Sequence, residues 1–348
     1  MRPIGRTLAT KDIKMSIKVA LIGTGIMGMD HARLFAEDLP NVELHTICDV
    51  DESRAKEVAD MFGAKSVSTN PEATATSSEI DAVVIASPDQ FHAPLTKAAI
   101  SAGKYVLCEK PLSPSSQECI EVMELETKIG KQMSQIGFMR RFDPSYAEMK
   151  ALLLQGKIGQ ALMMHNYHRN VSVPSNDFTP DMSISNSAPH EYDIARFMLD
   201  EEIKAISVYQ PQTQQPVKPV FMVLESESGV LVNVEINNVA AYGYDVRAEL
   251  IGEKGSLFLQ PTNVLTEQHI DLQASKGYAA DWRPRFAESY RLQNKAWINS
   301  ILTGKPSDIA SNAWDGYCAT RVAETGVAAL KSGSRQIVEL IEKPALYR

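Results

Sequence analysis

The chain has 348 residues, of which 44% are hydrophobic and 22% are charged, and its formal net charge is −8. These proportions are those of a globular protein, and the length favours two domains over one. Lysine and arginine are scattered through the chain, which excludes the concentrated basic surface that nucleic acid requires. The longest apolar runs, such as Ala82 to Ala86, fall far short of the roughly 18 residues that span a membrane. We therefore expect neither a nucleic-acid partner nor a membrane partner.

The four cysteines form no CxxC pair and no cluster with histidines. We therefore expect neither a metal site nor a disulfide framework, and the reducing cytoplasm is the expected location. Residues 1–15 carry basic side chains but lack the apolar core of a secretory signal. We interpret them as a disordered extension, or as the result of a misassigned start at Met1 where Met15 is the true one. A transit peptide is the alternative.

Short apolar runs alternate with amphipathic stretches as far as residue 138. The predicted strands are Lys18 to Gly23, Val42 to Asp49, Asp81 to Ser87, Lys104 to Glu109 and Gln132 to Phe138. The predicted helices are Met27 to Ala36, Glu52 to Phe62, Pro94 to Ala102 and Ser115 to Ile129. This alternation indicates right-handed βαβ units. Residues 16–138 are thus predicted to form an α/β domain of the Rossmann type, with a doubly wound parallel sheet.

The pattern changes after residue 138, where strands follow one another without intervening helices. The predicted strands are Ala161 to His168, Lys204 to Tyr209, Val217 to Ser226, Val230 to Asn238, Val246 to Gly252 and Ser256 to Leu259. Helical spacing occurs at Pro144 to Leu154, Arg285 to Leu302 and Ala313 to Leu330. Consecutive strands favour antiparallel pairing. Residues 139–342 are predicted to form an α+β domain with a largely antiparallel open sheet, which serves substrate binding and oligomerisation.

A glycine-rich turn lies between the first predicted strand and the first predicted helix. Gly23 allows a tight turn, Gly25 lets the backbone approach a pyrophosphate, and Gly28 lets helix and strand pack closely. Ile26 and Met27 lie within the turn and are counted with it as cofactor-binding positions. An incidental glycine turn is the alternative reading of this motif alone.

A carboxylate follows at the spacing that a dinucleotide site requires. Asp49 ends the second predicted strand about 20 residues after Gly28, where it can bind the adenosine ribose. Its charge repels a 2′-phosphate, so NAD is the expected cofactor, although Arg54 nearby leaves NADP use open.

Two further segments lie at the carboxyl ends of predicted strands, where ligands gather in open α/β sheets. Ser87 and His92 follow one strand and are expected near the cofactor; His92 is equally well explained as a histidine bonded to backbone at the start of a helix. Glu109 and Lys110 close the next strand and are followed by Pro111.

At these residues the chain resembles the Gfo/Idh/MocA oxidoreductases, and among them the inositol dehydrogenases most. The resemblance covers nearly the whole chain from Ile17. Besides the Glu-Lys-Pro motif, its carriers are Gly137 to Pro144, His168 to Asn170, His190 to Arg196, Tyr242 to Asp245 and Ala313 to Tyr317. It implies oxidation of a ring hydroxyl of a cyclic polyol, of the myo- or scyllo-inositol type, by hydride transfer to NAD. It also implies a homo-oligomer, either a tetramer or a dimer.

The resemblance assigns the reacting groups. Lys110 is the implied catalytic lysine beside the nicotinamide, with Glu109 at the cofactor, and His190 is the implied acid/base residue. Alcohol oxidation needs a base for the hydroxyl proton and a donor that steadies the alkoxide, and these two side chains supply both. The competing interpretation is that His190 merely hydrogen-bonds Asp193 on the same helix. The resemblance further implies a cis Lys110-Pro111 bond.

Several other side chains are expected to contact the polyol. They are Arg140, His168, Asn186, Asp193, Tyr242 and Tyr244. The residue four before the catalytic histidine is usually an aspartate in inositol dehydrogenases, and here it is Asn186. We count Asn186 as catalytic as well, as a neutral partner of His190 that cannot stabilise an imidazolium by charge. An aldose dehydrogenase of the same family remains an alternative, as does a non-catalytic NAD-binding regulator.

Overall fold

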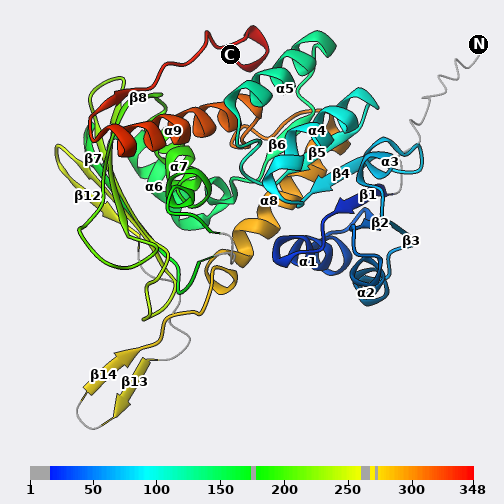
Figure 1. Ribbon diagram of the computed structural model, residues 1–348, viewed down its shortest axis with the longest axis horizontal. Coiled ribbons are helices and arrows are strands. Elements are labelled where there is room, and N and C mark those ends of the chain that lie inside the picture. Colours follow the sequence, from blue (N-terminus) through cyan, green and yellow to red (C-terminus); the bar gives the residue numbers. More distant parts are fainter. Residues whose placement is uncertain (1–15, 174–177, 260–266, 271–272) are drawn as a thin grey trace, which may run out of the picture.

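The computed structural model describes residues 16–173, 178–259, 267–270 and 273–348. The disordered extension expected over residues 1–15 lies outside the described residues. Figure 1 shows two bodies, each built on a sheet, joined by long helices. Within the described ranges, no helix is both long enough and apolar enough to cross a membrane.

The first sheet is parallel and has the strand order β3-β2-β1-β4-β5-β6. Its strands are β1 (Ile17–Ile22), β2 (Val42–Cys48), β3 (Ser66–Ser68), β4 (Ala82–Ile85), β5 (Tyr105–Cys108) and β6 (Ser134–Ile136). This order reverses between β1 and β4, which places a ligand crevice at their carboxyl ends. The predicted doubly wound sheet is confirmed, and β3 is a strand that the sequence reading missed.

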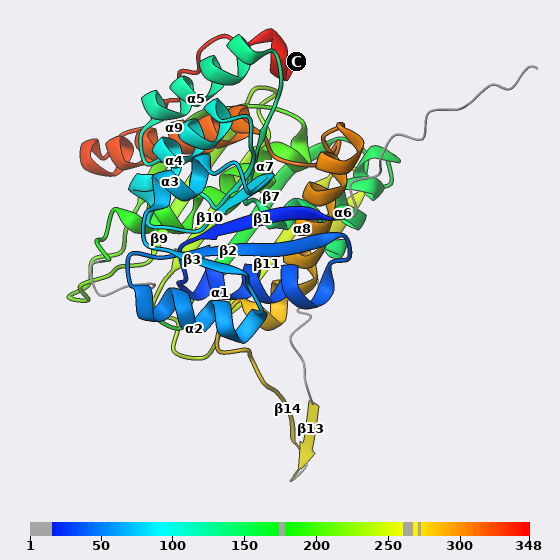
Figure 2. The same ribbon diagram turned by 90° about the vertical axis from the view of Figure 1, so that its right-hand side faces the viewer.

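Helices cover both faces of this sheet. They are α1 (Ile26–Arg33), the π-helical turn η1 (Leu34–Asp38), α2 (Glu52–Phe62), α3 (Pro71–Thr76), the 3-10 turn η2 (Asp89–Phe91), α4 (His92–Ser101) and α5 (Ser116–Ile129). Figure 2 shows α1 and α2 on one face of the sheet and α3 and α4 on the other. The short α3 and η2 were not predicted, whereas α1, α2, α4 and α5 match their predicted ranges to within a few residues.

The second sheet has the order β12-β11-β7-β10-β9-β8-β15. Its strands are β7 (Ala161–Arg169), β8 (Ile203–Tyr209), β9 (Val220–Ser226), β10 (Leu231–Asn237), β11 (Asp245–Gly252), β12 (Gly255–Phe258) and β15 (Gln336–Ile337). β7 and β10 pair in parallel and the other neighbours pair antiparallel, which confirms the mostly antiparallel sheet. A separate hairpin of β13 (Glu267–Ile270) and β14 (Gln273–Lys276) projects away from the body (Figure 1).

Side chains alternate across the second sheet. Val232, Val234 and Ile236 of β10 are buried, whereas Leu231 is 44% exposed. The buried side packs against the π-helical turn η4 (Ser183–Ser187), α7 (Pro189–Leu199) and α9 (Ala313–Ser332). The other helical elements of this part of the chain are the 3-10 turn η3 (Met139–Phe142), α6 (Pro144–Leu154), α8 (Arg283–Thr303) and the 3-10 turn η5 (Ala345–Tyr347).

The last long helices tie the two sheets together. Trp297 and Ile298 of α8 belong to the hydrophobic cluster of β1 and α1, and the Trp297 ring packs edge-on against Phe35 at 5.9 Å between centroids. α9 packs against α5 on one side and β8 on the other. Its start is fixed by a reciprocal cap between Asn312 and Asp315. α8 therefore lies within the range assigned to the second domain but completes the core of the first.

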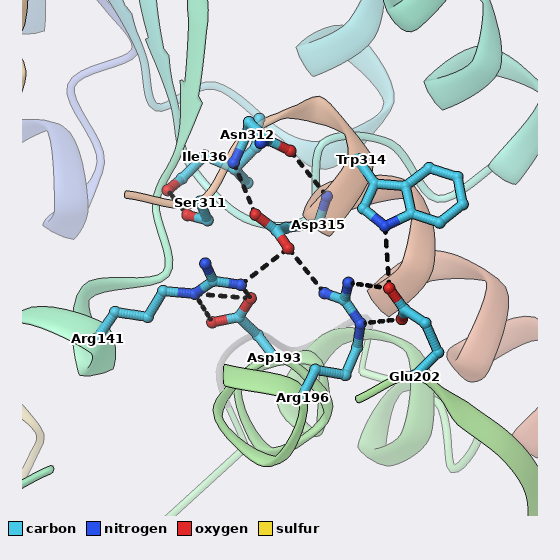
Figure 3. Close-up of polar contacts among 9 residues, drawn as sticks. All are labelled: Ile136, Arg141, Asp193, Arg196, Glu202, Ser311, Asn312, Trp314 and Asp315. Carbon is cyan, nitrogen blue, oxygen red and sulfur yellow. Dashed lines mark hydrogen bonds and ion pairs between the residues drawn. The ribbon is translucent and has the colours of Figure 1, made fainter. Parts of the chain in front are cut away.

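Buried charges hold α7 against α9 and η3 (Figure 3). This α7 ion cluster consists of Arg141, Asp193, Arg196, Glu202 and Asp315. Arg141 binds Asp193 with Nη2 to Oδ1 at 2.6 Å and also reaches Asp315 at 3.0 Å. Arg196 spans from Asp315, at 2.9 Å, to Glu202. Although burial opposes ionisation, the charges of Arg141 and Arg196 hold the pKa of Asp315 below its usual range. The cluster thereby fixes the helix that carries His190.

Removing Asp193 from this cluster is expected to destabilise the fold. Asp193→Ala removes the bidentate partner of the buried Arg141 guanidinium and leaves it only the contact with Asp315, so the loss should cost up to about 3–5 kcal/mol. Urea unfolding measures the change. The matched control is Glu225→Ala, which breaks an exposed pair with Arg335 and should barely change the unfolding free energy. Equal losses in the two variants would contradict a structural role for the cluster.

Candidate active site

The glycine turn after β1 has the shape of a dinucleotide cradle. Gly23 has φ +96°, and a Cβ there would lie 2.5 Å from the carbonyl oxygen of Ala86. A Cβ on Gly28 would lie 1.9 Å from the Gly23 oxygen, so this contact requires glycine. A Cβ on Gly25 would meet nothing within 4 Å, which leaves open space beside the first turn of α1. The backbone is accessible at the helix N-terminus, as pyrophosphate binding requires.

Asp49 lies at the mouth of this turn. Its Oδ2 accepts hydrogen bonds from the Thr24 amide at 2.8 Å and the Thr24 hydroxyl at 2.5 Å, and its Oδ1 accepts from the Asp51 amide. Burial opposes ionisation, but these hydrogen bonds and the charge of Arg54 lower the pKa of Asp49. Arg54 in turn donates to the Thr24 carbonyl at 2.8 Å. An ionised carboxylate and a guanidinium therefore flank the turn at Thr24.

A cavity of about 480 Å³ lies between the two sheets, beside the glycine turn. The expected site residues that line it are Ile26, Met27, Glu109, Lys110, His168, Asn186, His190 and Tyr244. The first four come from the Rossmann part and the last four from the second sheet and its helices. The cavity thus brings together the cofactor turn, the lysine after β5 and the histidine of α7. In the described part of the chain, no group of His, Cys, Asp and Glu is arranged to hold a metal ion.

His190 is a buried imidazole at the start of α7. Burial, followed by the positive charges of Arg140, Lys110 and His168, holds the pKa of His190 well below 6.5. Its Nδ1 is buried and has no hydrogen-bond partner among the described residues. The competing hydrogen bond to Asp193 does not form, because Asp193 binds Arg141. His190 is therefore neutral at pH 7, in the state that accepts a proton.

Lys110 reaches across to the second part of the chain. Its Nζ donates to the backbone oxygen of Asn186 at 3.1 Å, and the Lys110-Pro111 bond is cis, as the resemblance implied. The Asn186 side chain donates from Nδ2 to Asp89 at 2.7 Å. The expected partnership between Asn186 and His190 is therefore not formed as a hydrogen bond here, since the amide turns toward Asp89.

Glu109 is held by two neighbours that the sequence reading did not select. Asn294 of α8 donates from Nδ2 to Nδ1 of His31 at 2.9 Å. The other ring nitrogen of His31 must then carry the proton, and it donates to Glu109 at 2.9 Å. Glu109 also accepts from the Lys110 amide. The orientation of Glu109 is thereby fixed from the far end of the chain.

A second set of hydrogen-bonded, mostly buried side chains lies behind His168. Asn170 faces Nε2 of His168 with its amide nitrogen at 3.3 Å. Nδ1 of His168 lies 3.2 Å from the Glu191 carboxylate and 3.3 Å from Nη2 of Arg140, and Glu191 also binds Arg140. Burial raises the pKa of Glu191, but the charges of Arg140 and His168 outweigh it and lower the pKa overall. The His168 ring, which lines the cavity, is therefore held from behind by a buried ion pair.

Three residues expected to contact the polyol lie elsewhere. Arg140 is 1% exposed and binds Glu191 behind His168, because a buried guanidinium needs a carboxylate partner. Asp193 belongs to the α7 ion cluster on another side of its helix. Tyr242 is 49% exposed, and its hydroxyl bonds Arg169 and Asp245. Its neighbour Tyr244 is the tyrosine that lines the cavity.

Ser87 and His92 also lie outside the cavity lining. Both ring nitrogens of His92 face backbone carbonyl oxygens, of Pro111 at 2.6 Å and of Ser87 at 2.8 Å. Burial alone would lower the pKa of His92, but contacts with Cys108 and Pro111 raise it to about 10. This geometry matches the second interpretation of His92, a histidine bonded to backbone at the start of a helix.

The depressed pKa of His190 predicts a stability loss in acid. The unfolded chain takes up a proton on this histidine as the pH falls through about 6.5, whereas the folded chain does not. Unfolding free energy should therefore decrease below that pH. His190→Gln should reduce the slope by up to about 1.4 kcal/mol per pH unit in urea titrations. Parallel curves for the two proteins would show that His190 titrates normally in the fold.

Both parts of the chain match the same family of known proteins. Residues 17–138 match the model of an oxidoreductase family with an NAD-binding Rossmann fold, and residues 150–340 match the C-terminal alpha/beta domain of the same family. Inositol 2-dehydrogenase 2 of Saccharopolyspora erythraea is 41% identical over 339 residues, which cover 96% of this chain and 98% of that protein.

Solved structures are similar over almost the whole chain. Myo-inositol dehydrogenase from Lactobacillus casei, in complex with NAD(H) and myo-inositol, has a TM-score of 0.91 at 26% identity and covers 96% of this chain and all of its own. Scyllo-inositol dehydrogenase from the same species, with NAD(H) and scyllo-inositol, has a TM-score of 0.83 at 25% identity, over 93% of this chain and 99% of its own. The chain belongs to the Gfo/Idh/MocA oxidoreductase family.

Proposed function

We propose that the chain is an NAD-dependent inositol dehydrogenase, which oxidises a secondary ring hydroxyl of myo- or scyllo-inositol to a ketone. The observation that carries this proposal is the single cavity that holds Lys110, His190, His168 and Tyr244 next to the glycine turn. The similarity to inositol dehydrogenases over 96% of the chain supports the substrate class.

The side chains divide the work by charge and protonation. His190, neutral at pH 7, accepts the hydroxyl proton. Lys110 donates a hydrogen bond that stabilises the developing alkoxide, with its ammonium held near the cavity by the Asn186 carbonyl. Bound NAD supplies the hydride acceptor. His168, Asn170 and Tyr244 contribute polar groups to the cavity wall for the remaining ring hydroxyls.

The glycine turn and Asp49 are proposed to hold the cofactor. Gly23, Gly25 and Gly28 shape the pyrophosphate site, and the ionised Asp49 binds the adenosine ribose. Glu109 lines the cavity beside Lys110, close to the position that the nicotinamide takes in this proposal. Arg54 lies on the same side as Asp49 and is the group that would tolerate a 2′-phosphate.

The outer face of the second sheet is proposed to bind further copies of the chain, as a tetramer or a dimer. Met163, Phe221 and Leu231 are each at least 39% exposed and lie on the same face of neighbouring strands. An apolar face of this kind is normally covered. Sedimentation velocity should show an oligomer that Phe221→Lys weakens, and a monomeric native chain would contradict the proposed interface.

We also propose a cytoplasmic location, which the four free cysteines support.

Loss of Lys110 is expected to stop turnover and spare cofactor binding. Lys110→Ala should lower kcat by about 10²–10⁴, because the alkoxide loses its cationic donor. NADH absorbance with a panel of inositols and aldoses measures turnover, and calorimetry measures NAD affinity. The same panel tests the substrate class, because oxidation of aldoses alone by the native chain would contradict an inositol dehydrogenase. Unchanged turnover in the variant would remove Lys110 from the mechanism.

Loss of Asp49 is expected to narrow the preference for NAD over NADP. Asp49→Ala removes a charged hydrogen-bond acceptor for the ribose, which should raise the KM for NAD about 10- to 100-fold, and it also relieves the repulsion of a 2′-phosphate. Arg54→Ala is the matched control and should weaken NADP use selectively. Comparable kcat/KM values for NAD and NADP in the native enzyme would contradict the assignment.

A further inference from the structure

Two atoms of Asn186 are held from the Rossmann part of the chain. Its backbone oxygen accepts from Nζ of Lys110 at 3.1 Å, and its side-chain Nδ2 donates to Oδ2 of Asp89 at 2.7 Å. Asp89 begins η2, in the loop that follows the carboxyl end of β4, whereas Asn186 lies in η4 just before α7. The contact therefore joins the cofactor side of the cavity to the segment that leads into His190.

The chemistry of this pair fixes the direction of the Asn186 amide. An ionised carboxylate can only accept hydrogen bonds, so the atom that Asn186 turns toward Asp89 has to be its NH₂ group. The group left for the cavity, which Asn186 lines, is then the carbonyl oxygen Oδ1. Asp89 itself is half-buried and is not part of the cavity wall.

We propose that Asp89 is a positioning residue that makes Asn186 an acceptor for a substrate hydroxyl. Without Asp89 the amide could rotate and present either its NH₂ group or its oxygen to the ligand. With Asp89 in place, Oδ1 of Asn186 accepts a hydrogen bond from a ring hydroxyl. A substrate that carries only a hydrogen-bond acceptor opposite Asn186 is disfavoured. This inference rests on the proposed function, since it names one contact of the inositol site.

Exchanging the two side chains tests the direction of the hydrogen bond. Asn186→Asp alone brings two carboxylates into contact at 2.7 Å, which breaks the pair. Adding Asp89→Asn restores a donor and an acceptor with the polarity reversed. In the exchanged pair the residue at position 186 still presents an acceptor oxygen to the cavity, so the double variant should recover what the single variant loses.

The kinetic experiment compares the native chain with Asp89→Ala, Asp89→Asn, Asn186→Asp and the double exchange, using myo-inositol and scyllo-inositol. We expect Asp89→Ala to raise the KM for inositol about tenfold with little change in the KM for NAD. Asp89→Asn should raise the KM for inositol by a smaller factor, because the side-chain carbonyl of the new asparagine can still accept a hydrogen bond from Asn186. The double exchange should exceed Asn186→Asp by at least about tenfold in kcat/KM.

Three kinetic outcomes would overturn the proposal. They are an unchanged inositol KM in Asp89→Ala, an increase confined to the KM for NAD, and a double exchange no more active than Asn186→Asp. The second would make Asp89 a cofactor contact.

A double-mutant cycle on the free energy of unfolding tests the Asp89–Asn186 contact independently of the proposed function. The unfolding free energies of Asp89→Ala, Asn186→Ala and the double alanine variant are compared with that of the native chain. Non-additive changes support the contact, and additive changes overturn it whether or not any inositol is oxidised. Absence of inositol oxidation by the native chain, by contrast, would refute the proposed function alone.

Discussion

The α7 ion cluster is the constraint on which the active site depends. Asp193 and Arg196 both project from α7, and their partners lie on η3 and at the start of α9. Asn312, which caps α9, follows Ser311, and Ser311 exchanges hydrogen bonds with Ile136 at the end of β6 (Figure 3). The helix that presents His190 is therefore anchored, through charges buried away from solvent, to the edge strand of the Rossmann sheet.

This anchoring explains how a base and a donor from separate parts of the chain meet. Lys110 is placed by the carboxyl end of β5, and His190 is placed by α7. β5 belongs to the first sheet, whereas α7 packs on the second, so no single sheet holds both elements. A site that needs its groups within fractions of an ångström gains from rigid supports on both sides. Here the supports are polar, so small displacements of α7 would leave buried charges without partners.

The sequence was sufficient to predict where the candidate groups of the Rossmann part lie in the fold. The glycine turn, Asp49 and Lys110 each follow the end of a strand, where the position in the chain also determines the position in space. The role expected of Lys110 came from the family resemblance. Short elements such as β3 and α3 were missed, because three to six residues carry too little periodicity to be distinguished from loops.

The residues around His190 could not be placed in the same way. Nearly all of α7 is buried, including Glu191, Asp193 and Arg196, so hydrophobic periodicity does not indicate which side meets the cavity. Glu191 directly follows His190 yet supports His168 from behind. Asn294, which fixes His31, comes from a helix far along the chain. Such contacts depend on tertiary packing and leave no local pattern.

The return of α8 to the first sheet also has a consequence for biosynthesis. A ribosome releases β1 and α1 long before Trp297 and Ile298, the side chains that complete the hydrophobic cluster around them. The emerging Rossmann segment therefore keeps part of its apolar surface uncovered until α8 has been synthesised, and exposed apolar surface of this kind favours aggregation. The order of the helices in the chain thus determines how long that surface stays exposed.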